Sequence, residues 1–461
     1  MTGTISNITR VESWWYFEPR LDPLALTPEP VGEPDYTFIG DRAELGVRVD
    51  GDRFDLTGAF NYVRLENLPT NAIGPGGFGS GAFYFAATGV RYSYQLYLGE
   101  LTLRIKSRDR TRSLTVGRMP FSSARHRPLR SGAIDPGPGA VGRLAQERLE
   151  GRLIGNFEWS FYQRRFDGAR FDLDRGRWLF TAAGFVPTQG GFEESTNLSI
   201  PKVQIGIGSA TRTSGLSESQ AFAYLYRDRR RGNFAVVDNT ASPDRPVNIT
   251  IATLGGSHAL VRRTSAGAID VVGWGALQIG DWYGVPHRAG SATIEAGHRW
   301  MDAPLRPWLR GGYLWSSGDA APLDGRHGTF FQMLPSSRKY ALSSVYAQMN
   351  VRDAFLQAWI EPRRFSSRIE LHRVSLASGR DLWYQGSGAT ASRDRFFGFS
   401  GRAAGGNTSL GTVLEGTVDV PIRTYWSVNG YAGTMWGGGV VSRMFTGTRL
   451  TFWSVENVIR F

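Results

Sequence analysis

Arginine is the residue type in this chain with the clearest chemical role. The 461 residues include 53 basic side chains, of which only Lys106, Lys202 and Lys339 are lysines, so that 50 are arginines. A guanidinium group binds a carboxylate or phosphate through two parallel hydrogen bonds, whereas lysine acts as a point charge. The arginine excess and the formal net charge of +12 therefore favour an acidic partner. A genome rich in G and C would also produce this preference for arginine.

Other side chains form no pattern typical of a catalytic or metal site. Cysteine is absent, which excludes disulfides, thiol catalysis and cysteine-ligated zinc. The six histidines lack the spacing of a zinc motif, and His372 near Ser375 is interpreted as a chance pair. Neither a Gly-x-Ser-x-Gly elbow nor a phosphate-binding loop occurs. We therefore expect no enzyme, no catalytic residue, no cofactor and no metal ion, and the lack of a basic helix argues against nucleic acid.

The elements that position the arginines are expected to be β-strands. Apolar and polar residues alternate with a period of two in segments such as 42–49, 84–98, 153–164 and 292–300. Turn clusters separate such segments, as at residues 49–52. One strand with its connection about every 25 residues gives about 18 strands, as in a barrel built of long hairpins.

A membrane barrel accounts for this alternation better than a soluble sheet does. Aromatic residues flank apolar strands, as Trp274 and Trp282 or Trp426 and Trp436 do, which is typical of girdles at lipid headgroups. A soluble propeller would show a repeat of about 40–50 residues, and none occurs. A mean hydropathy of -0.27 is too polar for a helical membrane bundle.

The predicted fold is all-β. We expect residues 1–461 to form a single closed antiparallel transmembrane β-barrel of about 18 strands, with a range of about 16–20. Closure satisfies every backbone group in lipid, and at this strand number it leaves a water-filled lumen in which charged side chains can lie.

Both ends of the chain fit a location in the bacterial outer membrane. Counting back in twos from the C-terminus gives Phe461, Ile459, Asn457, Val455 and Trp453, and a terminal aromatic residue on an alternating strand is typical of outer-membrane barrels. The first residues lack the basic start and apolar core of a secretion signal. The chain is therefore either cytoplasmic or a mature sequence with an added methionine, and the strand pattern favours the second.

Strand-face parity indicates which charged residues point into the lumen. The predicted pore-lining, substrate-binding residues are Arg48, Arg91, Arg104, Arg152, Arg299 and Arg310, with Glu158 and Asp419 moderating the positive field. The alternative for each arginine is a pair with a neighbouring carboxylate that only stiffens the wall.

Two long connections have a separate predicted role. Residues 120–147 and 316–340 exceed the usual loop length, so each is expected either to gate the pore or to cap it on the extracellular side. Arg227, Arg229, Arg230 and Arg231 form a further basic cluster, which we interpret as a rim that binds lipopolysaccharide phosphates.

Two stretches resemble the alginate export family of outer-membrane porins. The first reads PWLRGGY at 307–313, SSGD at 316–319 and DGRHGTFFQMLP at 324–335. The second reads DLWYQG at 381–386 with Gly388, followed by SLGT at 409–412 and Asp419, and VGR at 116–118 is a weaker match. The resemblance, strongest over residues 307–420, implies an 18-stranded barrel that passes an acidic polysaccharide through a basic lumen.

Three functions remain open at this point. The first is a channel for an alginate-like polyuronate, which diffuses along the arginines and is received from a periplasmic secretion partner. The second is a passive uptake porin for small organic anions, and the third is a barrel that sheathes a periplasmic partner protein. For all three, the expected surroundings are outer-membrane lipid and lipopolysaccharide, and the expected state is a monomer.

Overall fold

The computed structural model describes residues 1–461 except 19–33, 72–79, 125–140, 193–197, 232–245, 337–344 and 392–396. Eighteen strands form one antiparallel sheet, in which each strand pairs with the next in the sheet. The sheet closes because β1 (Thr2–Trp15) pairs with β20 (Arg449–Arg460) as well as with β2 (Asp35–Asp50). The predicted closed barrel of about 18 strands is confirmed.

The remaining elements complete the ring or lie in its connections. The wall continues with β3 (Phe54–Glu66), β4 (Ser93–Lys106), β5 (Arg112–Met119), β6 (Phe166–Arg175), β7 (Trp178–Pro187), β8 (Val203–Thr213), β9 (Ser217–Asp228), β10 (Ile249–Thr264), β11 (Gly267–Trp282), β12 (Val285–Arg299), β13 (Trp308–Ser316), β14 (Val351–Ile360), β15 (Ser366–Leu376), β18 (Ser409–Arg423) and β19 (Trp426–Gly437). The connections contain α1 (Ser80–Thr88), α2 (Val141–Arg148), α3 (Gly439–Met444) and a hairpin of β16 (Leu382–Gly386) and β17 (Phe399–Ala403). Among the described residues, no helix is both long and apolar enough to cross a bilayer.

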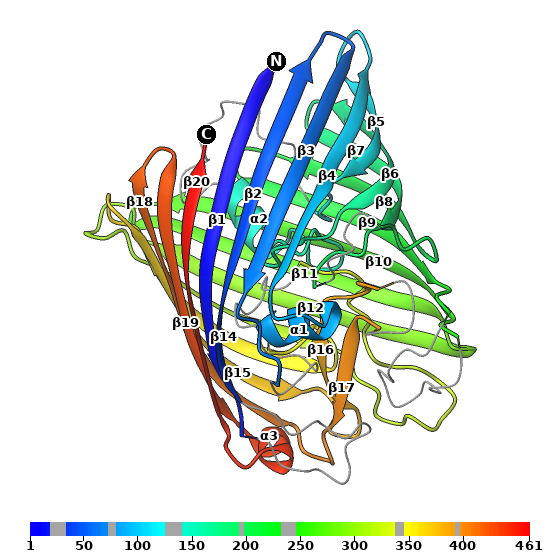
Figure 1. Cartoon of the computed structure of the whole chain (residues 1–461), viewed down its shortest axis with the longest axis vertical. Helices are drawn as coiled ribbons and strands as arrows, with labels where there is room; N and C mark the ends of the chain where they lie inside the picture. The colour runs from blue at the N-terminus through cyan, green and yellow to red at the C-terminus, as the bar shows by residue number, and fades with distance from the viewer. Residues whose placement is uncertain are drawn as a thin grey trace.

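The two ends of the barrel differ in the length of their connections. Both chain termini lie at one end, and α3 lies at the other (Figure 1). The end with the termini has short turns, such as 51–53 and 176–177, whereas the opposite end carries long connections such as 120–165 and 317–350. Short periplasmic turns and long extracellular loops are the rule for outer-membrane barrels. The termini therefore mark the periplasmic end.

The outer face of the wall is apolar. Leu277, Ile294 and Leu356 point outward with about two thirds of each side chain exposed, while their neighbours along the strand are buried or polar. Trp426 and Trp436 also point outward, at the two ends of β19, as the predicted girdle requires. This surface suits the hydrocarbon of the bacterial outer membrane.

The predicted outward position of Trp274 and Trp282 is wrong. Both lie on the inward face of β11, and both are buried. The indole of Trp282 stacks on His327 with ring centroids 4.2 Å apart. These tryptophans are buried by the connections that enter the bore, so an aromatic residue near a strand end does not by itself identify the lipid face.

One predicted strand is wrong in its first half, and another is wrong throughout. The first part of segment 84–98 belongs to α1, and β4 begins only at Ser93. Segment 153–164 has no strand and lies in the β5–β6 connection, where nearly every residue is buried. Its alternating letters reflect packing on several sides inside the barrel, because a half-buried strand would leave every second residue exposed.

The apolar outer face predicts a cost for placing a charge there. Leu277→Arg should destabilise the folded barrel in a bilayer by about 2–4 kcal/mol, because the charge must enter hydrocarbon. Leu323→Arg is the matched control, since Leu323 is 97% exposed in the β13–β14 connection and should tolerate arginine. Denaturant titration in liposomes measures both changes, and equal costs at the two positions would contradict this orientation.

Candidate functional site in the barrel bore

Part of the β5–β6 connection crosses the bore, which is therefore not simply filled by water as predicted. At one end α2 packs against β9 and β10, and Arg148 forms an ion pair with Glu295 of β12 at 2.7 Å. At the other end the Trp159 carbonyl accepts hydrogen bonds of 3.0 and 3.1 Å from Arg10 of β1. Because β1 and β10 are half the ring apart in strand order, residues 141–165 span the bore from wall to wall.

Two further connections meet this crossing segment inside the barrel. Arg164 is fully buried and donates hydrogen bonds to the carbonyls of Gly155 (3.3 Å), Leu334 (3.1 Å), Ser387 (2.6 Å) and Ala389 (3.4 Å). These acceptors belong to the β5–β6, β13–β14 and β15–β18 connections. One guanidinium group thus holds three connections together. Of the predicted gate segments 120–147 and 316–340, residues 125–140 and 337–340 lie outside the described part.

Three guanidinium groups converge on one carboxylate in the bore. Arg148 binds Glu295 through two hydrogen bonds of 2.7 and 3.1 Å. Arg152 lies 3.1 Å and Arg310 lies 3.2 Å from the same carboxylate, and Arg310 also pairs with Asp270 at 3.0 Å. All five side chains are at least nine-tenths buried. We call these five residues the arginine cluster, and with two carboxylates and three guanidinium groups it carries one excess positive charge.

Two of the predicted pore residues, Arg152 and Arg310, belong to the arginine cluster. Arg310 lies on the inward face of β13 as parity predicted, whereas Arg152 lies in the crossing segment and not on a strand. Arg299 is also inward and buried, and it pairs with Glu361 at 2.6 Å. Sequence reasoning missed Arg148, since nothing in a short helical segment indicates which wall it contacts.

Three other predicted pore residues face the bore away from the arginine cluster. Arg48 pairs with Asp50 at 2.7 Å near the periplasmic end, and both side chains are about half exposed. Arg104 donates to the Ser113 hydroxyl at 3.2 Å. Asp419 accepts a hydrogen bond from Ser366 at 3.3 Å.

The last two predicted pore residues are not on strands. Arg91 is exposed in the β3–β4 connection, where its side chain donates to Asn67. Glu158 is exposed on the crossing segment, and its backbone carbonyl accepts a hydrogen bond from Gln163. Parity failed for both because each lies in a segment that does not continue the wall.

The predicted basic rim is divided between two environments. Arg227, Arg229 and Arg231 line a groove of about 560 Å³ with Lys202 at the extracellular ends of β8 and β9. Arg230 instead points inward, is fully buried and pairs with Asp228 at 2.7 Å. Arg230 is therefore removed from the rim, and lipopolysaccharide binding by the remaining cations stays a prediction.

A buried carboxylate joins the β13–β14 and β15–β18 connections. Asp381 accepts hydrogen bonds from the hydroxyls of Thr329 (2.6 Å) and Tyr384 (2.7 Å) and from the backbone N–H of Asp319 (2.7 Å). Burial disfavours the charged form and raises the pKa of Asp381 to about 6, although these hydrogen bonds oppose the shift. Asp381 thus titrates in a range that leaves most carboxylates ionised.

Removal of the Arg164 side chain should loosen the contents of the bore. Arg164→Ala deletes hydrogen bonds from a charged donor, each worth about 1.5–3 kcal/mol, and frees three connections from one another. We expect a larger single-channel conductance in planar bilayers. Arg326→Ala is the control, since Arg326 is exposed in the β13–β14 connection. Unchanged conductance in Arg164→Ala would show that the clamped segments do not limit the passage.

Asp381 should make stability depend on pH. Its pKa is raised in the folded protein, so its contribution is complete below about pH 4 and is lost as the pH rises through about 6. The rise of the Asp381 pKa from its ordinary value to about 6 corresponds to about 3 kcal/mol. Thermal unfolding midpoints of the natural protein should therefore fall across this range relative to those of Asp381→Asn. A constant difference between the two proteins would contradict the buried, protonated carboxyl.

Comparison with known proteins supports the fold and identifies the family. The structure resembles that of OccAB1 of Acinetobacter baumannii, with a TM-score of 0.57 and 7% identity over 100% of this chain and 96% of that chain. It also resembles OpdK of Pseudomonas aeruginosa, with a TM-score of 0.55 and 8% identity over 100% and 99% of the two chains. No curated protein matches the sequence. These likenesses show the fold alone.

The family is shown by the sequence itself. The family model described as alginate export matches residues 131–446, which is more than half of the chain and includes Arg148, Glu295 and Arg310 of the arginine cluster. Barrel closure, the apolar outer face and the charged bore are those of a bacterial outer-membrane channel. The chain belongs to the alginate export family.

Proposed function

We propose that this channel conducts an acidic polysaccharide of the alginate type through its arginine-lined bore. The observation that carries the proposal is the arginine cluster, in which Arg148, Arg152 and Arg310 surround Glu295. Arg148 binds the carboxylate of Glu295 through two hydrogen bonds. A uronate carboxylate accepts hydrogen bonds from a guanidinium group in the same way as the Glu295 carboxylate does. It would therefore compete with Glu295 for these guanidinium groups.

Movement of a polymer requires several weak sites rather than one strong one. Glu295 and Asp270 offset most of the positive charge of the three arginines in the arginine cluster. A passing carboxylate can therefore replace one of these carboxylates on an arginine without being held too tightly to leave. Arg299, paired with Glu361, and Arg48 with Asp50 offer further partners of the same kind. We propose residues 141–165 as the gate, because they reach from one wall of the bore to the other. A periplasmic secretion partner would deliver the polymer at the end that carries the termini.

The second candidate is uptake of small organic anions. The filling of the bore by three connections held at Arg164 favours this candidate, because a narrow passage suits a small solute. One structure of Pseudomonas aeruginosa OpdK, which shares the fold at a TM-score of 0.54 and 7% identity over 100% and 98% of the two chains, was solved with vanillate. That ligand belongs to OpdK, and it suggests an aromatic acid as the small-anion probe.

The two candidates differ in what blocks the current. For a polysaccharide channel, oligouronates of increasing length added to a planar bilayer should block chloride current with affinity that rises with chain length. For a small-anion porin, benzoate-type acids should block and long oligouronates should not. Neutral oligosaccharides of matched length are the control, and block by these alone would contradict both candidates.

Replacement of Arg299 and Arg310 by glutamine should abolish or reverse the anion preference. The double change leaves Glu361, Asp270 and Glu295 with fewer cationic partners, so that the bore becomes more negative. The reversal potential in a salt gradient measures the effect, and Arg326→Gln is the control on an exposed connection. Removal of one partner of a buried pair costs about 3–5 kcal/mol, so heat-modified gel mobility must first show a folded barrel. Unchanged selectivity would show that these arginines do not set it.

A further inference from the structure

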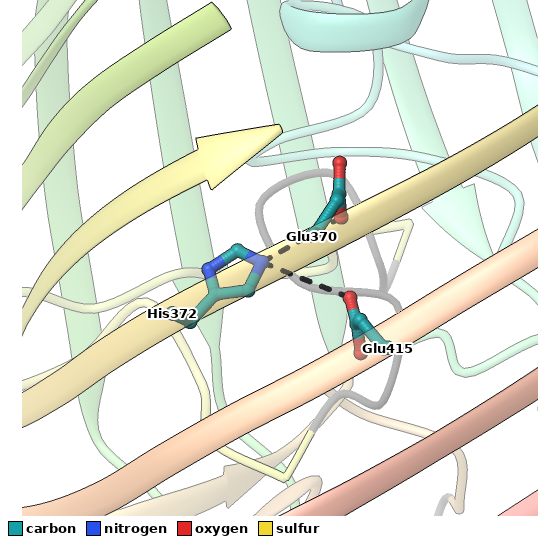
Figure 2. Close-up of side chains that lie close together, drawn as sticks. All are labelled: Glu370, His372 and Glu415. Carbon is teal, nitrogen blue, oxygen red and sulfur yellow. Dashed lines mark ion pairs between the residues drawn. The ribbon is translucent and has the colours of Figure 1, made fainter. Parts of the chain in front are cut away.

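A second charged cluster lies on the inward face of the wall, apart from the arginine cluster. Glu370 and His372 are two residues apart on β15 and share one face, and Glu415 lies on the neighbouring strand β18 (Figure 2). All three side chains are at most 2% exposed. The sheet register places Glu370 directly opposite Glu415. Like charges directly opposite each other destabilise a sheet, and burial strengthens the repulsion. Arg368 lies 3.5 Å from Glu370 Oε1 and offsets part of this repulsion, and a cation between the two glutamates would offset the rest.

The two ring nitrogens of His372 face different carboxylates. Its Nδ1 lies 3.0 and 3.1 Å from the two oxygens of Asp353, which in turn accepts a hydrogen bond of 2.6 Å from Tyr346. Its Nε2 points between the glutamates, 3.5 Å from Glu370 Oε2 and 3.8 Å from Glu415 Oε1 (Figure 2). Among the described residues this buried Nε2 has no hydrogen-bond partner. A polar atom in that state is costly unless a ligand occupies the gap.

The carboxylates are held so that one oxygen of each faces this gap. Tyr431 donates to Glu415 Oε2 at 2.8 Å, and Gln357 donates to Glu370 Oε1. One possible ligand atom from each of Glu370, His372 and Glu415 lies within 4.8 Å of the other two. Ligand atoms about 2.0–2.2 Å from a tetrahedral zinc ion stand about 3.3–3.6 Å apart. The two distances from Nε2 are therefore close to those of a metal site and longer than ordinary hydrogen bonds.

We propose that Glu370, His372 and Glu415 bind a divalent transition-metal ion of the Zn²⁺ class. The ligands are His372 Nε2, Glu370 Oε2 and Glu415 Oε1, with water in the fourth position. An imidazole ligand favours Zn²⁺ over Ca²⁺ and Mg²⁺, which prefer oxygen ligands only. Asp353 is a positioning residue, because a carboxylate that accepts the Nδ1 proton orients Nε2 toward the metal.

The metal would act on the barrel wall and not on the permeating solute. It joins β15 to β18, next to the register shift between Val374 and Ser375, and replaces the repulsion of Glu370 and Glu415 by two attractive contacts. The large connection 377–408 leaves the wall between these two strands. Metal binding would therefore strengthen the pair of strands that carries this insertion, and it does not depend on which anion the channel conducts.

Metal binding by the full-length barrel in detergent tests the proposal. After treatment with EDTA, calorimetric titration should show one Zn²⁺ per chain, and Co²⁺ should give the visible absorption of a tetrahedral site. His372→Gln and Glu415→Gln should each lose this binding, and Asp353→Asn should weaken it by about 10–100-fold. His258→Gln is the matched control, since His258 is exposed on β10 beside Ser219 and should leave binding unchanged.

The outcome is decided by the natural protein together with the variants. Zinc should also raise the thermal unfolding midpoint of the natural protein and of His258→Gln, but not that of Glu415→Gln. Each variant is first checked for a folded barrel by heat-modified gel mobility, and two independent ligand variants guard against failure of one to fold. The proposal would be overturned if the natural protein bound neither Zn²⁺ nor Co²⁺ stoichiometrically. It would also be overturned if both ligand variants bound the metal as tightly as the natural protein does. The cluster would then be a histidine paired directly with carboxylates.

Discussion

The whole architecture depends on one constraint, which is that hydrocarbon offers no hydrogen-bond partner to the backbone. Pairing of β1 with β20 satisfies this constraint by removing both sheet edges. Closure then assigns opposite environments to the two faces of every strand. Apolar side chains such as Leu277 and Leu356 cover the outside, and charged side chains such as Arg310 can lie only within the bore.

Within the bore, charge pairing and inserted chain act together. Buried ions cost several kcal/mol each unless they are paired, so the arginines that enter the bore bring carboxylates with them. Glu295 attracts Arg148 and Arg152 from the crossing segment and thereby holds that segment against the wall. The guanidinium groups that would recognise an acidic solute are thus the same groups that hold the crossing segment in the bore, so under the proposed function recognition would be coupled to opening.

Period-two alternation, together with the turn clusters and the aromatic residues at strand ends, predicted the barrel and the strand number, and alternation alone gave the inward direction of Arg310. It works there because each strand of the wall has one lipid face, and a single parity then applies along the strand unless a bulge intervenes, as at Gly99 of β4. The same reasoning failed for Arg152 and Glu158, because segment 153–164 alternates without belonging to the wall. The acidic cluster with His372 was also missed, since Glu415 meets it only through a strand pairing that spacing along the chain does not show.

The two-faced wall can be tested most directly on neighbouring residues of β2. The chain has no cysteine, so nitroxide labels can be attached to Glu44→Cys and Leu45→Cys separately. Glu44 faces the bore and Leu45 is more than half exposed on the outer face. In liposomes, relaxation measurements should show the label at 45 colliding with oxygen dissolved in lipid and the label at 44 colliding with a water-soluble nickel chelate. Equal access of the nickel chelate to both labels would contradict the account.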